Sequence, residues 1–182
     1  MDQAIESKHV TLPVDGDDVT VRYLTGGDGP PLLFLHGIGL DAAGVSGRYA
    51  LPALAADHTV YALDLPGHGD SEKPRRTYTT DYYVDTLSAF VEALDLAGAS
   101  VVGVSMGGAV ALGHALDGGS PESLVLVDSY GLGADAYWRT GASIALRMPF
   151  ADSMLWGSMG SRAAVRTSLQ TMAGGELPDD LV

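Results

Sequence analysis

The stretch that decides the fold is Ala99–Leu116, ASVVGVSMGGAVALGHAL. Its first six residues predict a short buried strand, and residues 106–116 predict a helix. Between them, GVSMG at residues 103–107 matches G-x-S-x-G, the pattern of a serine held on a sharp strand-to-helix turn. Such a turn requires neighbours without side chains at positions 103 and 107, because the backbone and the helix approach each other closely there.

The five-residue motif is weak evidence by itself. With 24 glycines in the chain, chance would supply about 0.2 copies of it. The predicted strand before it and the predicted helix after it give the motif its weight, because a serine nucleophile on a tight turn requires that setting.

Apolar runs and helical patterns alternate along residues 9–128, which is typical of a mostly parallel α/β sheet with helices on both faces. A turn at residues 15–18 predicts an antiparallel hairpin at the sheet edge. The predicted strands are His9–Val14, Val19–Leu24, Pro31–His36, Thr59–Leu65, Ala99–Val104 and Leu124–Asp128. The other predicted helices run from about Gly47 to Ala56 and from Thr79 or Thr80 to about Leu96.

The pattern changes after residue 133. Residues 134–182 show apolar helical stretches, broken by glycine and proline, and no strand pattern. We therefore expect a core domain at residues 1–133 and a partial helical cap, or lid, at residues 134–182. A helical subdomain that serves stability alone is the alternative.

Two further motifs lie at the ends of predicted strands. His36-Gly37-Ile38-Gly39 follows PLLFL, and DLPGHGDS at residues 64–71 follows the next strand. Together with the turn at Ser105, these segments resemble the α/β-hydrolase superfamily, in its cap-bearing branch. The resemblance covers residues 10–133 well and the rest loosely.

The resemblance implies roles for individual residues. Ser105 would be the nucleophile, and the backbone N–H groups of Ile38 and Met106 would form the oxyanion hole. Asp64 would shape the fold, and His36 and His68 would order loops. A serine at this turn, instead of an aspartate, favours hydrolysis of an ester, thioester, lactone or carbon–carbon bond in a small acyl-type substrate.

The expected catalytic partners of Ser105 are missing. A serine hydroxyl needs a base, usually a histidine that a carboxylate holds in place. The only later histidine is His114, about 13 Å further along the same helix, too far for direct contact. By the resemblance, the acid and the histidine follow later strands. We therefore expect a C-terminally truncated fold without its last two strands, and a chain that is almost inactive.

Two alternatives remain open. Asp128, at the end of the strand after Ser105, is placed to act as the triad acid, although that position is more often structural. The chain could also be a non-catalytic or degenerate hydrolase-like module that binds a small apolar molecule. A second chain could then pair with the exposed edge at residues 124–128.

Composition limits the classes of partner. Acidic residues outnumber basic ones 23 to 10, giving a formal net charge of −13, which argues against nucleic acid and anionic membranes. Aspartate dominates the acids and Lys8 and Lys73 are the only lysines, a bias that resembles proteins of halophilic organisms; an ordinary acidic enzyme is the alternative.

Other features argue for a cytoplasmic protein without a cofactor. The N-terminal residues lack the pattern of a secretory signal, and the chain has no cysteine. The uncharged run at residues 96–116 contains too many glycines for a good membrane span. The five histidines lack the spacing of metal ligands, so we expect neither a metal nor a cofactor. The sequence leaves the oligomeric state open.

Overall fold

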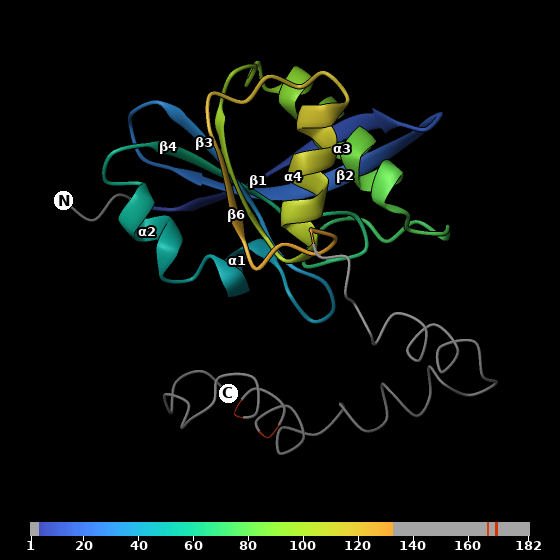
Figure 1. Cartoon of the computed structure of the whole chain (residues 1–182), viewed down its shortest axis with the longest axis horizontal. Coiled ribbons are helices and arrows are strands. Elements are labelled where there is room, and N and C mark those ends of the chain that lie inside the picture. The colour runs from blue at the N-terminus through green and yellow to red at the C-terminus, as the bar shows by residue number, and fades with distance from the viewer. Residues whose placement is uncertain (1–3, 133–166, 168–169, 171–182) are drawn as a thin grey trace. The chain divides into compact units, whose positions relative to one another are not determined.

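A computed structural model describes residues 4–132 together with Thr167 and Gln170. In this part of the chain six strands form a sheet with the order β1-β2-β4-β3-β5-β6 (Figure 1). The strands are β1 Glu6–Val14, β2 Asp17–Gly26, β3 Pro31–Leu35, β4 Thr59–Leu63, β5 Ser100–Val104 and β6 Leu124–Val127. Each coincides with a strand that the sequence predicts, within a few residues at either end.

The sheet is mixed, and its parallel half carries the chemistry-bearing loops. β1 pairs antiparallel with β2, and β2 pairs antiparallel with β4. β4, β3, β5 and β6 run parallel to one another. The predicted edge hairpin is therefore confirmed, and the carboxyl ends of the four parallel strands lie along one edge of the sheet.

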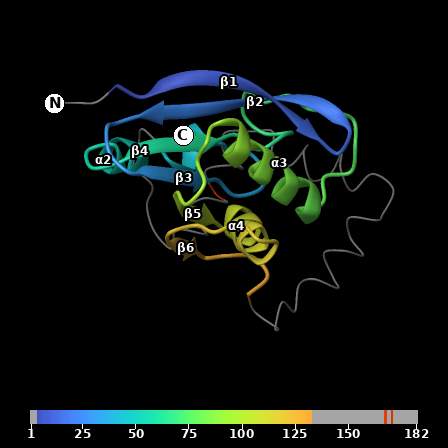
Figure 2. The same cartoon turned by 90° about the horizontal axis from the view of Figure 1, so that it is seen from above.

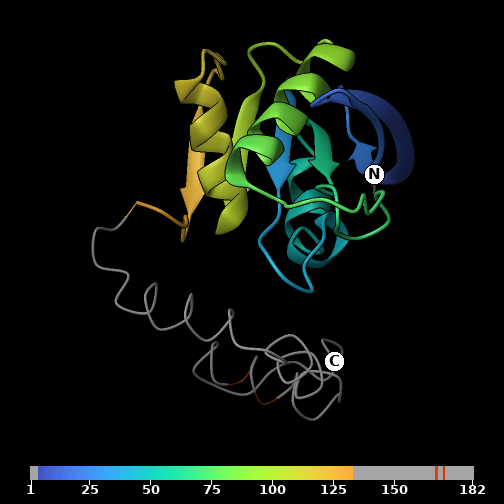
Figure 3. The same cartoon turned by 90° about the vertical axis from the view of Figure 1, so that its right-hand side faces the viewer.

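Helices cover both faces of the sheet, as the sequence predicts (Figures 2 and 3). The helices are α1 Ala43–Ser46, α2 Ala50–Leu54, α3 Thr80–Ala93 and α4 Met106–Leu116. Successive residues of a strand point to opposite faces. In β3, Leu33 and Leu35 accordingly belong to the core on the α3 and α4 side, whereas Leu32 and Phe34 pack with α1 and α2.

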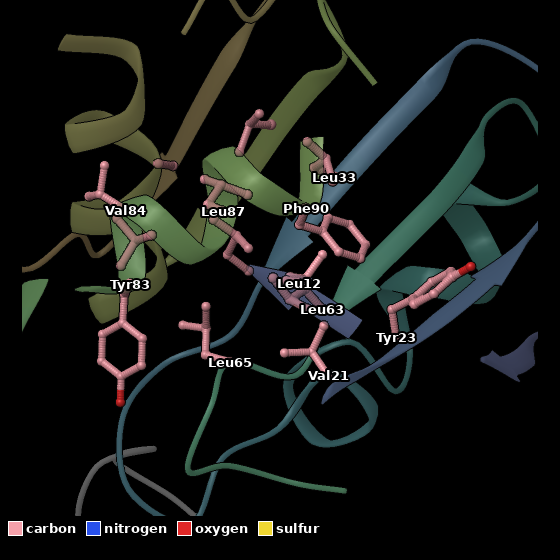
Figure 4. Close-up of a cluster of buried hydrophobic side chains, with 14 of the residues drawn as sticks. Leu12, Val21, Tyr23, Leu33, Leu63, Leu65, Tyr83, Val84, Leu87 and Phe90 are labelled. Atoms are coloured by element: carbon pink, nitrogen blue, oxygen red, sulfur yellow. The ribbon is translucent and has the colours of Figure 1, made fainter. Parts of the chain in front are cut away.

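The larger core lies beneath α3 (Figure 4). Phe90 is completely buried and meets the ring of Tyr23 edge to face, with 5.3 Å between ring centroids. Thr79 caps α3, since its side chain accepts a hydrogen bond of 3.1 Å from the N–H of Tyr82. The buried face of α3 includes Leu87, as predicted from its apolar spacing.

One predicted helix is wrong in its extent. Instead of a continuous helix at 47–56, the structure has the short helices α1 and α2, separated at residues 47–49. Gly47 follows the last residue of α1, and its N–H donates to the carbonyl of Ala43. A Cβ at position 47 would lie 2.5 Å from that carbonyl oxygen, so the close backbone approach that ends α1 requires glycine.

The chain divides into two units, Met1–Gly133 and Ala134–Val182. The predicted cap falls in the second unit and lies outside the described residues, apart from Thr167 and Gln170. Within the described part, none of the helices has the length and apolar character needed to cross a membrane.

Candidate active site

Four predicted functional residues follow strands whose carboxyl ends lie at one edge of the sheet. His36 follows β3, Asp64 follows β4, Ser105 follows β5 and Asp128 follows β6. β5 lies between β3 and β6, with Gly103 opposite Leu35 and Val104 opposite Val127. The parallel arrangement therefore places the loops after β3 and β6 on either side of Ser105.

Ser105 has a backbone conformation that non-glycine residues rarely adopt. Its φ is 51° and its ψ is −113°, which typically costs about 1–3 kcal/mol. Two hydrogen bonds to the end of β6 and the segment after it hold it there. Its N–H donates to the carbonyl of Val127 over 2.9 Å, and its carbonyl accepts from the N–H of Tyr130 over 3.0 Å. Ser105 is therefore fixed in this strained conformation as the N-cap residue of α4.

The two glycines of the motif allow this turn. A Cβ on Gly107 would lie 2.4 Å from the carbonyl oxygen of Leu35 and 2.6 Å from that of His36. A Cβ on Gly103 would lie 2.5 Å from the carbonyl oxygen of Gly107. All of these are contacts with backbone atoms, so the turn requires both glycines, as the sequence predicts.

In the described part of the chain, two backbone N–H groups near Ser105 have no acceptor. Met106 is the first residue of α4, so its N–H has no partner within the helix. The N–H groups of Met106 and Ile38 form no hydrogen bond with other described residues. A Cβ on Gly37 would lie 3.5 Å from the Cβ of Ser105, so the loop that carries Ile38 runs directly beside the serine. The amino end of α4 adds a partial positive charge.

His36 fixes the peptide that carries the Ile38 N–H. The ring is completely buried; its Nδ1 donates to the carbonyl of Gly37 over 2.7 Å, and its Nε2 accepts from the N–H of Leu65 over 3.0 Å. This pairing requires a neutral ring. Because C=O and N–H of a trans peptide point in opposite directions, holding the Gly37 carbonyl fixes the direction of the Ile38 N–H. Burial is the main cause that lowers the pKa of His36.

Asp41 holds the same loop from its other end. Its Oδ2 accepts from the N–H of Gly37 over 2.7 Å and from the hydroxyl of Ser46, and its Oδ1 accepts from the N–H of Ala42 over 2.8 Å. The motif at residues 36–39 gave no indication of this carboxylate, although an aspartate just before a short helix is a common capping signal.

Asp64 is a structural residue in this geometry. It is completely buried, and its carboxylate accepts from the N–H of Ala43 over 2.8 Å and from that of Asp70 over 2.9 Å. Its Oδ2 also lies 3.0 Å from Nε of Arg22. The carboxylate thereby joins β2, α1 and the loop after β4. Sequence analysis did not single out Arg22, because the pairing joins residues that lie far apart in the chain.

No histidine bonds to the hydroxyl of Ser105 in the described part of the chain. His114 lies at the opposite end of α4, where its Nδ1 is 2.8 Å from Oγ of Ser88. Both nitrogens of His36 are occupied by the backbone, and His68 packs against His36 with 5.0 Å between ring centroids. The distance between Ser105 and His114 expected from helix geometry is thus consistent with the fold.

Asp128 lies directly after β6 with an exposed side chain and a φ of 45°. It forms no hydrogen bond or ion pair with the other described residues. Apolar side chains are exposed in the loop after β3 and in the segment after β6. They are Ile38 at 71%, Leu40 at 60%, Tyr130 at 45% and Leu132 at 58%. Within the described residues, no group of His, Cys, Asp or Glu has the arrangement of a metal site.

This geometry defines an α/β-hydrolase fold, and the sequence profile of the alpha/beta hydrolase family matches residues 32–181. The chain belongs to that family. It is 38% identical over 130 residues to the 2-hydroxy-6-oxo-6-(2'-aminophenyl)hexa-2,4-dienoic acid hydrolase of Metapseudomonas resinovorans, covering 70% of this chain and 45% of the relative.

The chain is also similar to an acetyltransferase component and to a hydrolase of known structure. Over 113 residues the chain is 44% identical to the dihydrolipoyllysine-residue acetyltransferase component of the acetoin cleaving system of Pseudomonas putida, covering 60% of this chain and 30% of that protein. The solved 2-hydroxy-6-oxo-6-phenylhexa-2,4-dienoate hydrolase of Rhodococcus sp. strain RHA1 superposes with a TM-score of 0.62 at 28% identity, covering 73% of this chain and 50% of that one. The chain thus spans less than half the length of these curated relatives.

Proposed function

We propose that Ser105 is the nucleophile of a serine hydrolase that acts on a small acyl-type molecule. The observation that carries the proposal is the strained backbone of Ser105 beside the N–H groups of Ile38 and Met106, which have no acceptor among the residues that the structure describes. A preorganised pair of donors next to a nucleophile is what acyl transfer needs, because negative charge develops on the carbonyl oxygen in the transition state.

In the proposed reaction, Oγ of Ser105 attacks the substrate carbonyl carbon while a base takes the hydroxyl proton. The carbonyl oxygen becomes an oxyanion that accepts hydrogen bonds from the Ile38 and Met106 N–H groups. The intermediate collapses, the leaving group departs with the proton, and an acyl group remains on Ser105. Water then attacks this ester with help from the same base, releasing the acid and restoring the serine.

The base and its carboxylate are proposed to be residues that this sequence does not contain. His114 is paired with Ser88 at the other end of α4, and His36 is held by the backbone on both sides. Without the triad histidine, turnover should fall by a factor on the order of 10⁶. Asp128 keeps its place as an alternative acid, since it follows the strand next to Ser105 and its carboxylate is exposed.

The substrate class is a proposal for the whole protein. The relatives named as dienoic acid hydrolases favour hydrolysis of a carbon–carbon bond, alongside the ester, thioester and lactone hydrolysis that a serine nucleophile also supports. The exposed apolar side chains of Ile38 and Leu40 favour an apolar substrate. We propose residues 134–182 as part of a lid on that substrate.

The test is a time course of p-nitrophenyl acetate cleavage with Ser105→Ala and Ser100→Ala as comparisons. We expect a slow release that stops near one equivalent of p-nitrophenolate, because solvent hydroxide takes the Ser105 proton in place of the missing base while the oxyanion hole assists acylation, and deacylation lacks its base. Ser105→Ala should lose this release, and Ser100→Ala, at the start of β5, should keep it. Sustained turnover that depends on Ser105 would contradict the missing base.

A non-catalytic module that binds a small apolar molecule is the second candidate. The observation that favours it is the lack of any histidine on Ser105 among the described residues. It predicts no release of p-nitrophenolate above that of Ser105→Ala, together with saturable binding of an apolar ligand in both proteins.

A further inference from the structure

A cavity lies at the end of the sheet opposite Ser105. Its volume is about 240 Å³, and it lies between the end of α3, the start of β5 and the loop after α4. Its walls are mainly apolar and include Leu33, Val91, Leu96 and Val101. Neither Ser105 nor the loop at residues 36–39 lines it, so it is separate from the candidate active site.

His114 supplies a polar group in this apolar wall. The residue is only 9% exposed. Its Nδ1 is satisfied by the Ser88 hydroxyl at 2.8 Å, while its Nε2 has no hydrogen-bond partner among the described residues. Gly119, also in the wall, lies so close that a Cβ there would come within 2.4 Å of Nε2. Nε2 is not one of the fully buried atoms that lack a partner, so it is open to the cavity, where water or a ligand hydroxyl can satisfy it.

Charge around the cavity selects against an anionic ligand. The cavity adjoins the carboxyl end of α4, where unpaired carbonyl groups give a partial negative charge. Asp117 adds a carboxylate near the imidazole, and the chain as a whole carries a net charge of −13. Burial lowers the pKa of His114, which keeps the ring neutral near pH 7. A neutral ligand with a hydroxyl group fits these conditions better than a carboxylate or phosphate does.

The volume limits the size of the ligand. An apolar protein cavity of about 150 Å³ holds benzene, so this cavity has room for one ring with a small substituent. We propose that it is a binding site for a neutral, single-ring molecule with one hydroxyl group, which bonds to Nε2 of His114 while its ring packs on Val91 and Leu96. The proposal does not depend on the chemistry assigned to Ser105.

The test is a titration of the isotope-labelled 182-residue chain with phenol, followed by NMR chemical shifts. We expect saturable shifts at residues 96–101 and 114–121. Ala97→Trp places a large side chain on an exposed position at the cavity wall and should abolish the saturable shifts. His9→Phe, an exposed histidine on β1, is the matched control and should leave them unchanged.

The role of His114 is tested by the choice of ligand. Phenol should bind the wild-type chain at least five-fold more tightly than toluene does, and His114→Phe should remove this difference. If His114→Phe does not fold, the Ala97→Trp result and the preference of the wild type for phenol still test the proposed binding site. Shifts confined to residues 37–38 and 105–106, a linear response without saturation, or equal binding of phenol and toluene to the wild type would overturn the proposal.

Discussion

The candidate site requires a glycine at position 107, because the neighbouring backbone leaves no space for a side chain there. The first turn of α4 passes so close to the end of β3 that a methyl group at position 107 meets two carbonyl oxygens. Neither can move without shifting β3 or the loop that carries Ile38. We therefore expect Gly107→Ala to lower the free energy of unfolding by about 1–3 kcal/mol, measured by urea denaturation.

Gly44→Ala is the matched control for that substitution. Gly44 also lies in a helix, α1, but the nearest atom to its added Cβ would be Cδ1 of Leu24 at 3.7 Å, an ordinary contact. Alanine there should be neutral or stabilise by up to about 1 kcal/mol, because it favours the helix. Equal losses in the two variants would show that the close approach at Gly107 does not constrain the turn.

The ionisation of His36 should appear in the pH dependence of stability. Because burial lowers its pKa from the ordinary value of 6.5, the folded chain binds fewer protons than the unfolded chain at pH values just below 6.5. The contribution to stability is therefore fully present above 6.5 and is lost as the pH falls toward the folded-state pKa. We expect the free energy of unfolding, from urea denaturation, to fall across that range and His36→Gln to flatten the decline.

His114 is the internal comparison for this measurement. Burial also lowers its pKa, so His114→Gln should remove a separate part of the same decline. His9→Gln, on the exposed surface of β1, should remove none of it. A decline that persists unchanged in both buried-histidine variants would contradict the assignment of neutral, buried rings.

At the scale of elements, the parallel strands were predictable because they are buried on both faces. The run LLFL in β3 is continuously apolar, as a strand covered on two sides should be. LVLV in β6 is equally apolar, although Val125 and Val127 are exposed at the end of the described sheet. β2 extends further than predicted, because Asp17 pairs with Val14 and Gly26 pairs with Val60. The ends of β2 are determined by pairing with β1 and β4, and the local sequence pattern does not reveal this pairing.

The ion pair between Arg22 and Asp64 joins several elements and was not predictable from spacing. Asp64 is completely buried, whereas the side chain of Asp70, the second carboxylate on Arg22, is 76% exposed. We expect Asp64→Asn to cost about 3–5 kcal/mol of unfolding free energy, because it removes the buried charge partner of the Arg22 guanidinium and leaves only the exposed Asp70. Chemical denaturation measures the loss.

Asp70→Asn makes the same chemical change on the same arginine, 3.2 Å from its Nη2. Because Asp70 is exposed, the loss should be below about 1 kcal/mol. If the two variants lose the same stability, the burial of Asp64 does not strengthen its role, and the account of this junction is wrong.

At the scale of the whole molecule, the net charge of −13 should make stability depend on salt. We propose a cytoplasmic protein of a halophilic organism, in which screening shortens the range of repulsion from about 10 Å at 0.1 M to about 3 Å at 1 M ionic strength. The melting temperature should rise steeply with KCl, as measured by scanning fluorimetry.

The control variant removes exposed charge without removing a described contact. Asp18→Asn, Asp28→Asn and Asp57→Asn together neutralise three exposed carboxylates. This variant should melt higher at low salt and respond less to KCl. A flat response of the wild-type chain between low and molar KCl would remove the halophilic interpretation.

The candidate site could be predicted from sequence as far as local motifs extend. The placement of Ser105 beside the loop that carries Ile38 was predictable, because parallel strands bring the loops that follow them to one end of the sheet. His114 was excluded as the base of Ser105 from sequence alone, because the two residues are too far apart along the same helix. Asp41, Arg22 and the cavity beside His114 were missed, since each depends on contacts between segments that no local pattern joins.

The nucleophilic role of Ser105 is tested most directly by intact-mass spectrometry after incubation with p-nitrophenyl acetate in molar KCl, followed by peptide mapping. We expect one acetyl group per chain, located on Ser105 and absent from Ser105→Ala; this group should accumulate because the proposed site lacks the base that would hydrolyse it. Acetylation spread over exposed lysines with Ser105 unmodified would contradict the account.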